Sequence, residues 1–126
     1  MIRIPDAGRF ELRLMDGSVN PYLLQAGILA AGNDGMDKKR DPGKPILINM
    51  YTDYKDYPHL KKLPSELESA LEKLDESKEL NEAFGKKTIN SYIKLKNNEI
   101  NNFNAKEIFS KEKPITDWEK LNTLDC

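Results

Sequence analysis

The sequence predicts an α+β fold that is mostly helical, with a short N-terminal strand region, then a buried helix, then several amphipathic helices. Three observations predict this fold. Residues 9–15 alternate between charged and apolar side chains, as the residues of a half-buried strand do. Residues 22–31 are almost all apolar or small. After about residue 53 the chain is rich in Lys, Glu and Asn, with apolar residues at helical spacing.

The composition excludes several classes of function. The 126 residues carry 20 Lys and Arg against 21 Asp and Glu, for a net charge of −1. This lacks the basic footprint of a nucleic-acid binder and any polybasic block for anionic lipid. The one cysteine, Cys126, allows no disulfide framework, and the N-terminus has no secretory apolar region. We therefore expect a cytoplasmic protein with no nucleic-acid partner and no membrane association.

The alternating segment predicts a strand over 9–15 with two unlike faces. Phe10, Leu12 and Leu14 share the face that we expect to be buried, and the charged side chains share the other face. A turn at residues 16–18 ends the strand. Residues 1–18 thus form the predicted strand region.

The next element is a helix that we expect to be covered on most sides. Asn20 supplies an N-cap side chain and Pro21 fits the first helical position. The buried helix is assigned to 20–40, although Asp34 and Gly35 are interpreted as turn residues. The prolines and glycine of residues 41–45 forbid further helix, so 41–63 is a connector.

The remaining residues, 64–126, are predicted to be helical. Ser65 with Glu68 has the spacing of a capping box, and so does Thr116 with Glu119. A second, short helical turn is predicted over 77–84, and it ends at a glycine. From about residue 86 to 104 one apolar stripe recurs at helical spacing, formed by Ile89, Tyr92, Ile93, Ile100 and Phe103.

The charged face of the predicted strand is the main functional candidate. Arg9, Glu11 and Arg13 project from it to the same side. One interpretation is an outer strand with a solvated face of mixed charge. The other is an anion site beside a metal ion, because guanidinium groups bind phosphate or carboxylate and glutamate is a hard ligand for Mg²⁺ or Mn²⁺. Arg3 adds another donor if the segments 2–5 and 9–13 run side by side.

A family resemblance favours the second interpretation. The first third of the chain resembles the C-terminal part of the catalytic domain of a glutamine synthetase, in the runs 2–5, 8–14, 20–23 and 30–35. Weaker resemblance continues to the C-terminus, so practically the whole chain, 1–126, aligns with the end of a longer enzyme. One departure lies at residues 6–8, a segment shorter than in many relatives that lacks a lysine they use near ATP.

The resemblance implies ATP-dependent ligation of glutamate and ammonia through a γ-glutamyl phosphate. It implies that Arg3 and Arg9 contact ATP and its phosphates. Glu11 resembles a ligand of Mg²⁺ or Mn²⁺. Arg13 resembles the arginine that holds glutamate and stabilises the phosphorylated intermediate, which makes it the catalytic residue.

The resemblance also implies that much of the enzyme is missing. The family builds its site between an N-terminal domain of one subunit and the catalytic domain of the next. This sequence lacks that N-terminal domain and most of the metal ligands. We expect a fragment that is inactive as an isolated chain and that self-associates as a homo-oligomer through unpaired strand edges. The alternative is a noncatalytic helical interaction or oligomerisation module derived from the same fold.

Several conspicuous residues are expected to have ordinary roles. His59 is the only histidine and lacks the partners that a metal site needs, so it is interpreted as a surface residue. Tyr51 falls where some relatives carry a modified tyrosine, but its surroundings differ and an ordinary loop tyrosine is expected. Tyr92, Phe103 and Trp118 are interpreted as packing residues, because base stacking needs a basic groove.

Overall fold

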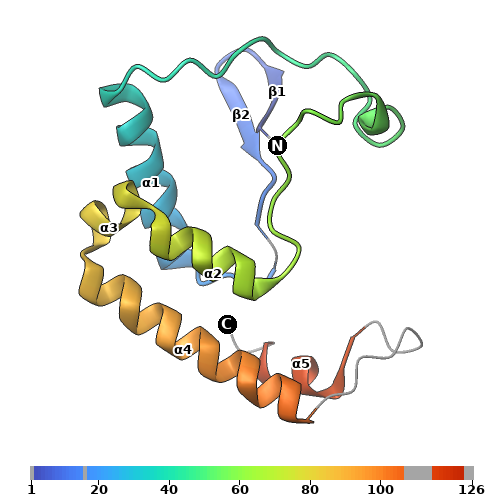
Figure 1. Cartoon of the computed structure of the whole chain (residues 1–126). Coiled ribbons are helices and arrows are strands. Elements are labelled where there is room, and N and C mark those ends of the chain that lie inside the picture. Colours follow the sequence, from blue (N-terminus) through green and yellow to red (C-terminus); the bar gives the residue numbers. More distant parts are fainter. Residues whose placement is uncertain (1, 16, 107–114, 124–126) are drawn as a thin grey trace.

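The computed structural model describes residues 2–15, 17–106 and 115–123, with only the backbone of 105 and 106. Figure 1 shows a short two-stranded sheet beside an open arrangement of helices, which confirms the predicted mostly helical α+β fold. The elements in chain order are β1 (Ile2–Asp6), β2 (Arg9–Leu12), α1 (Pro21–Asp37), a 3-10 turn (Tyr54–Asp56), α2 (Leu67–Glu76), α3 (Lys78–Phe84), α4 (Lys86–Lys106) and α5 (Asp117–Asn122). The expectations for Asp16 and Cys126 lie outside the described residues.

Strands β1 and β2 form an antiparallel hairpin. Arg3 pairs with Glu11, and Asp6 pairs with Arg9 across the turn. Gly8 occupies the turn at φ 79°, a left-handed conformation that suits glycine. The register shifts between Arg3 and Asp6, where Pro5 has no N–H to donate to the partner strand. The predicted strand over 9–15 is too long, since β2 ends at Leu12.

Helix α1 begins where the sequence predicts. The Asn20 Oδ1 atom accepts hydrogen bonds from the backbone N–H groups of Tyr22 and Leu23, each at 3.0 Å. The prediction of a turn at Asp34 and Gly35 is wrong, because both residues lie within the helix, which continues to Asp37. Glycine costs a helix interior only about 1 kcal/mol, so a single glycine does not end a helix that has tertiary contacts.

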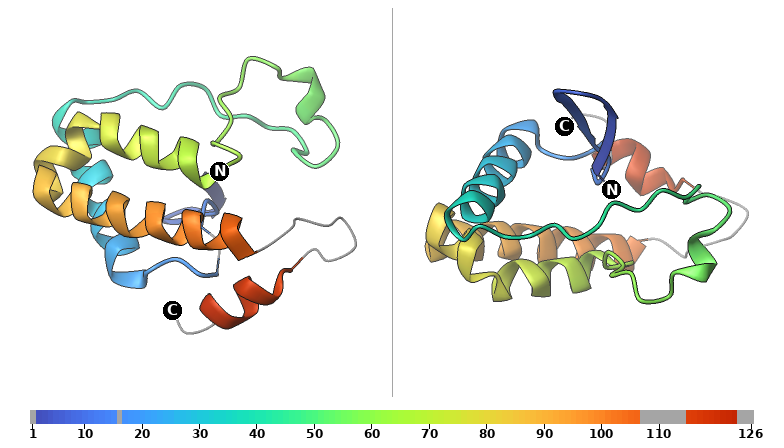
Figure 2. Two further views of the ribbon diagram at one scale, coloured as in Figure 1. Left: turned by 60° about the horizontal axis from the view of Figure 1, so that its bottom comes forward. Right: turned by 90° about the horizontal axis from the view of Figure 1, so that it is seen from above.

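The predicted burial of the strand and of α1 is wrong for the described chain. The Phe10 side chain is 64% exposed, and α1 contains no buried residue. In the right-hand view of Figure 2 the hairpin lies apart from α2 and α4. Alternation and apolar composition predict that a face is suited to burial, but they do not supply the element that covers it.

The core lies where α2 and α3 pack against α4 (Figure 1). Leu71 of α2 and Ile89 of α4 are each only 5% exposed. The apolar stripe predicted for 86–104 is confirmed as the buried or half-buried side of α4. Helix α3 ends at Gly85 as predicted, with φ 80°. The Ser65 capping box is wrong: α2 begins at Leu67, and its N-cap makes no side-chain hydrogen bond.

The capping box at the start of α5 is confirmed. The Glu119 backbone N–H donates to the Thr116 Oγ1 atom at 3.1 Å, and the Thr116 N–H donates to the Glu119 carboxylate at 2.6 Å. The Glu119 carboxylate accepts from the Thr116 backbone N–H and also from the Thr116 hydroxyl, at 2.8 Å, and these two hydrogen bonds hold the pKa of Glu119 below its ordinary value. The Trp118 ring meets the Phe103 ring edge-on at 5.6 Å, which joins α5 to α4 and confirms the packing role of both residues.

A cluster of four charged side chains ties the end of α1 to α3. The Lys38 Nζ atom lies 2.6 Å from the Asp34 carboxylate and 3.1 Å from the Glu79 carboxylate. The Arg40 guanidinium also pairs with both acids, at 2.7 and 3.0 Å. The hydrogen bond from Lys38 is the main cause that lowers the pKa of Asp34. These pairs supply a tertiary reason for α1 to continue through Asp34.

Candidate functional site

The hairpin brings two arginines to one glutamate. The Arg3 Nη1 atom lies 3.2 Å from the Glu11 Oε2 atom, because the antiparallel register sets these residues opposite each other. The Arg9 Nη2 atom lies 3.6 Å from the Glu11 Oε1 atom, because residues two apart in a strand share a face. The condition stated for Arg3 is therefore met: segments 2–5 and 9–13 run side by side as far as Leu12. We call Arg3, Arg9 and Glu11 the hairpin triad.

The triad is open to solvent. The side chains of Arg3 and Arg9 are 59% and 62% exposed, and that of Glu11 is 34% exposed. Ion pairs this exposed each contribute only about 0 to 1 kcal/mol to folding, so the triad does not hold the hairpin together. Its guanidinium groups retain N–H donors in a planar fork that matches phosphate and carboxylate oxygens. The arrangement can bind an anion on the charged side of the sheet.

Asp6 is a neighbour that the sequence reasoning missed. Its Oδ2 atom lies 3.5 Å from the Arg9 Nη2 atom. With Asp6 included, two acids neutralise two arginines, so an anionic ligand has to displace Asp6 from Arg9 to gain the full charge of that guanidinium. The sequence contained a signal for this pair, because Asp6 and Arg9 are opposite charges three residues apart with Gly8 between them.

Arg13 is not part of the triad. It follows the last residue of β2, and its side chain is exposed. Within the described part of the chain, no ion pair engages its guanidinium. Arg13 therefore lies at the start of the segment that joins β2 to α1. The sheet register thus places Arg3, Arg9 and Glu11 together, but does not place Arg13.

The described residues alone do not fit a divalent metal ion. Mg²⁺ takes about six oxygen ligands. No group of three or more His, Cys, Asp or Glu side chains among the described residues is arranged to hold a metal. Glu11 offers one carboxylate, and both of its oxygens already face arginines. Any metal bound through Glu11 needs further ligands from outside these residues.

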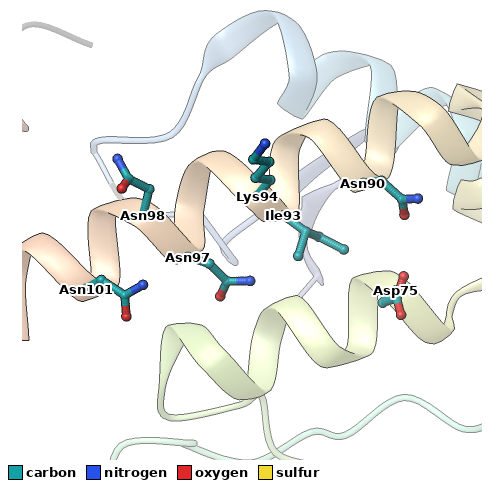
Figure 3. A pocket seen from close by; sticks show the side chains of 7 residues that line it. All are labelled: Asp75, Asn90, Ile93, Lys94, Asn97, Asn98 and Asn101. Atoms are coloured by element: carbon teal, nitrogen blue, oxygen red, sulfur yellow. The ribbon is translucent and has the colours of Figure 1, made fainter.

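The structure has a hollow away from the hairpin. It opens between α2 and α4 and is lined by Asp75, Asn90, Ile93, Lys94, Asn97, Asn98 and Asn101. Figure 3 shows Ile93 and Asn97 pointing toward α2, whereas Lys94 and Asn98 point away from it. The lining is mostly neutral amides and lacks the convergent charges of the triad. We therefore keep the hairpin as the candidate site.

The residues expected to have ordinary roles are found in ordinary surroundings. His59 is exposed and its ring lies 5.8 Å from the Tyr57 ring. Tyr51 is 82% exposed in a turn of the connector. The Lys96 Nζ atom lies 5.8 Å from the centre of the Tyr92 ring. Among the described helices, none has both the length and the apolar character needed to span a bilayer.

Comparisons with known proteins identify relatives of the whole chain. The family model of the glutamine synthetase catalytic domain matches residues 1–119. The chain is 45% identical over 125 residues to the glutamine synthetase of Rhizobium meliloti (strain 1021), and it is 43% identical over 128 residues to that of Rhizobium leguminosarum bv. phaseoli. Each match covers 99% of this chain but only 27% of the relative.

The chain is also similar to a ligase of a different name and to a solved structure. A glutamate–methylamine ligase of Methyloversatilis universalis is 36% identical over 129 residues. A solved structure titled "GmaS/ADP complex-Conformation 1" superposes with a TM-score of 0.77 at 39% sequence identity. That match covers 100% of this chain and 27% of the solved chain. The matching segment of that longer solved chain therefore has the fold described above.

Proposed function

The chain belongs to the glutamine synthetase catalytic-domain family, and on this premise we propose that it supplies one wall of the active site of an ATP-dependent glutamate–ammonia ligase. The known relatives are ligases, so the family is enzymatic. The chain spans about a quarter of their length. The whole enzyme's reaction, in which glutamate is phosphorylated and ammonia then displaces the phosphate, is part of the proposal.

The observation that carries the proposal is the convergence of Arg3 and Arg9 on one side of the hairpin. Each guanidinium lies within 3.6 Å of the Glu11 carboxylate and stays more than half exposed. We assign both arginines to the phosphates of ATP, because fixed bidentate donors stabilise the charge that develops on a transferring phosphoryl group. The solved relative is a complex with ADP, which supports a nucleotide.

Glu11 and Arg13 complete the proposed wall. We assign Glu11 as one ligand of Mg²⁺ or Mn²⁺, with the other ligands supplied from outside the described residues. We assign Arg13 to glutamate, where its fork pairs with a carboxylate and then with the acyl phosphate that forms from it. Arg13 has no ion-pair partner among the described residues, so it needs no rearrangement to bind an anion.

The 126 residues alone are proposed to be inactive. The described part of the chain offers one candidate metal ligand, and every member of the triad faces solvent. Electrostatic stabilisation of a transition state requires a site from which water is excluded. An exposed hairpin does not provide it.

We assign ammonia as the nitrogen nucleophile of the reaction. The rhizobial glutamine synthetases are 45% and 43% identical to this chain, against 36% for the glutamate–methylamine ligase. We further propose that the complete enzyme is a homo-oligomer in the cytoplasm. Comparing ammonia with methylamine as the second substrate tests the assignment of the amine.

A noncatalytic interaction module is the second candidate. The observation that favours it is the region 64–126, where helices dominate and the described residues show no convergent charges like those of the triad. Such a module needs its packing faces but not its arginines. Substitutions in the triad distinguish the two functions, because they alter catalysis only if the chain is part of an active site.

The test replaces the matched segment of the Rhizobium meliloti enzyme with these 126 residues. We expect the chimera to form glutamine, and the 126-residue chain alone to form none. Arg3→Ala and Arg9→Ala should raise KM for ATP, and Arg13→Ala should raise KM for glutamate and lower kcat. Arg40→Ala is the matched control, since it removes an exposed, ion-paired guanidinium outside the hairpin. A chimera whose activity is unchanged by the substitutions at Arg3, Arg9 and Arg13 contradicts the proposal.

A further inference from the structure

A second acid lies on the charged side of the hairpin because the strand pairing is irregular. In a regular strand, residues three positions apart point to opposite faces of the sheet. Here Arg3 pairs with Glu11 and Asp6 pairs with Arg9, with a register shift between Arg3 and Asp6. Residues directly opposite each other in an antiparallel pair share a face. The shift therefore brings Asp6 to the same side of the sheet as the hairpin triad.

Asp6 and Glu11 share one nitrogen of Arg9. The Arg9 Nη2 atom lies 3.5 Å from the Asp6 Oδ2 atom and 3.6 Å from the Glu11 Oε1 atom. Both distances exceed the roughly 2.7 to 2.9 Å of a charge-assisted hydrogen bond between a cationic nitrogen and a carboxylate. The Asp6 side chain is also 76% exposed. The contact between Asp6 and Arg9 is therefore loose, and an anionic ligand can take its place at little cost to folding.

The Asp6 carboxylate cannot move far when it is displaced. Only Ala7 and Gly8 separate the end of β1 from the start of β2, and Gly8 occupies this turn at φ 79°. The Cβ atoms of directly opposite residues lie about 5 Å apart. Charges are screened over about 8 Å at physiological ionic strength. The negative charge of Asp6 therefore still acts on an anion that Arg9 holds.

We propose that Asp6 competes with the nucleotide phosphates for Arg9 and thereby weakens the binding of ATP at this site. Asp6 is a positioning residue, because it acts through the Arg9 guanidinium. Its role rests on the proposed function, which assigns Arg9 to the phosphates of ATP. Electrostatic repulsion grows with the charge of the ligand, so Asp6 opposes the binding of ATP more strongly than that of glutamate.

Removing the charge of Asp6 should therefore tighten the binding of ATP. The experiment introduces Asp6→Asn, which keeps the size of the side chain, into the chimera with the Rhizobium meliloti enzyme. We expect the KM for ATP to fall by about threefold or more, while kcat and the KM for glutamate change by less than about twofold. The dissociation constant for ATP, measured by calorimetry without turnover, should fall with the KM. Asp6→Glu keeps the charge and should restore the values of the unsubstituted chimera.

Asp75→Asn is the matched control. Asp75 is an exposed acid outside the hairpin, and its carboxylate lies 2.6 Å from the Lys86 Nζ atom. Its substitution removes one ion-paired negative charge, as Asp6→Asn does, and should leave the binding of ATP unchanged. Raising the KCl concentration should reduce the gain from Asp6→Asn, because salt screens exposed charges. A purely structural effect of the substitution would not depend on salt in this way.

Arg9→Ala separates a failure of this role from a failure of the proposed function. An Arg9→Ala chimera that binds ATP as tightly as the unsubstituted chimera contradicts the assignment of Arg9 to phosphate. If Arg9→Ala weakens ATP binding but Asp6→Asn leaves it unchanged or also weakens it, the competition is overturned while the proposed function stands. The same conclusion follows if Asp75→Asn tightens binding as much as Asp6→Asn does, or if the gain persists undiminished at high salt.

Discussion

Arg3 and Glu11 face each other across the hairpin, with the Arg3 Nη1 atom 3.2 Å from the Glu11 Oε2 atom. This cross-strand pair brings together residues eight positions apart, and Arg9 joins it from the other side of Glu11. The pair depends on the Gly8 turn, which returns the chain so that β1 and β2 run side by side. The anion site proposed above follows from this one register.

Replacing the central carboxylate tests whether the triad serves stability or function. Glu11→Gln removes the charge that both arginines face, but all three side chains are substantially exposed. We expect the free energy of unfolding of the chain to change by less than about 1 kcal/mol. Urea denaturation followed by circular dichroism measures this. A loss of several kcal/mol would show that the triad is a structural element and would count against a role in binding.

A substitution in the core is expected to cost much more stability than one in the triad. Leu71→Ala removes a side chain that is 5% exposed between α2 and α4, so we expect a loss of about 2 to 4 kcal/mol in the free energy of unfolding. Leu67→Ala makes the same substitution in the same helix, where the side chain is 45% exposed. It should cost less than about 1 kcal/mol. Equal losses in the two variants would place the core elsewhere.

The cap of α5 can be tested with the only tryptophan. Thr116→Ala removes the side-chain oxygen that accepts from the Glu119 N–H, so we expect a local loss of about 1 kcal/mol. Trp118 should separate from Phe103, and its fluorescence emission should shift to longer wavelength. Thr116→Ser keeps the hydroxyl and should leave the emission unchanged. An unchanged spectrum in Thr116→Ala would show that the aromatic contact holds α5 without its cap.

The contact between α1 and α3 should weaken in acid. The pKa of Asp34 is lowered, mainly by the hydrogen bond from Lys38, and the pKa of Glu79 is lowered by its own backbone N–H and then by Lys38. A lowered pKa in the folded state stabilises the fold above the unfolded pKa, and this stabilisation is lost as the pH falls through the folded value.

The expected loss therefore begins below about pH 4.5 and continues to lower pH. Amide exchange in α1 and α3, measured between pH 6 and pH 3 after correction for intrinsic rates, checks it. Asp34→Asn with Glu79→Gln should remove the pH dependence, because neither amide titrates in this range. A pH dependence that persists in the double variant would assign the effect to other carboxylates.

Local signals in the sequence were sufficient for several helix ends. Asn20 followed by Pro21, and Thr116 followed by Glu119, each act within four residues, so the sequence contains the whole interaction. Ser65 and Glu68 have the same spacing, but α2 begins at Leu67 and its N-cap makes no side-chain hydrogen bond. Spacing permits a capping box without requiring one.

The failures concern long-range contacts. Asp34 and Gly35 resemble a turn, but Asp34 pairs with Lys38 and Arg40, which also reach Glu79 more than 35 residues away. The burial expected for Phe10 and for α1 needs neighbours that these residues do not provide. Arg3 could join the candidate site only through the strand register, which the sequence left as a condition.

The most direct measurement of the central claim is the glutamate dependence of glutamine formation by the chimera carrying Arg13→Lys. Lysine keeps the charge but loses the bidentate fork, so we expect KM for glutamate to rise by about tenfold or more while KM for ATP changes little. Arg40→Lys should leave both constants unchanged. An Arg13→Lys chimera with the same KM for glutamate and the same kcat as the Arg40→Lys control would contradict the assignment of Arg13 to glutamate, and with it the claim that this chain supplies a wall of the active site.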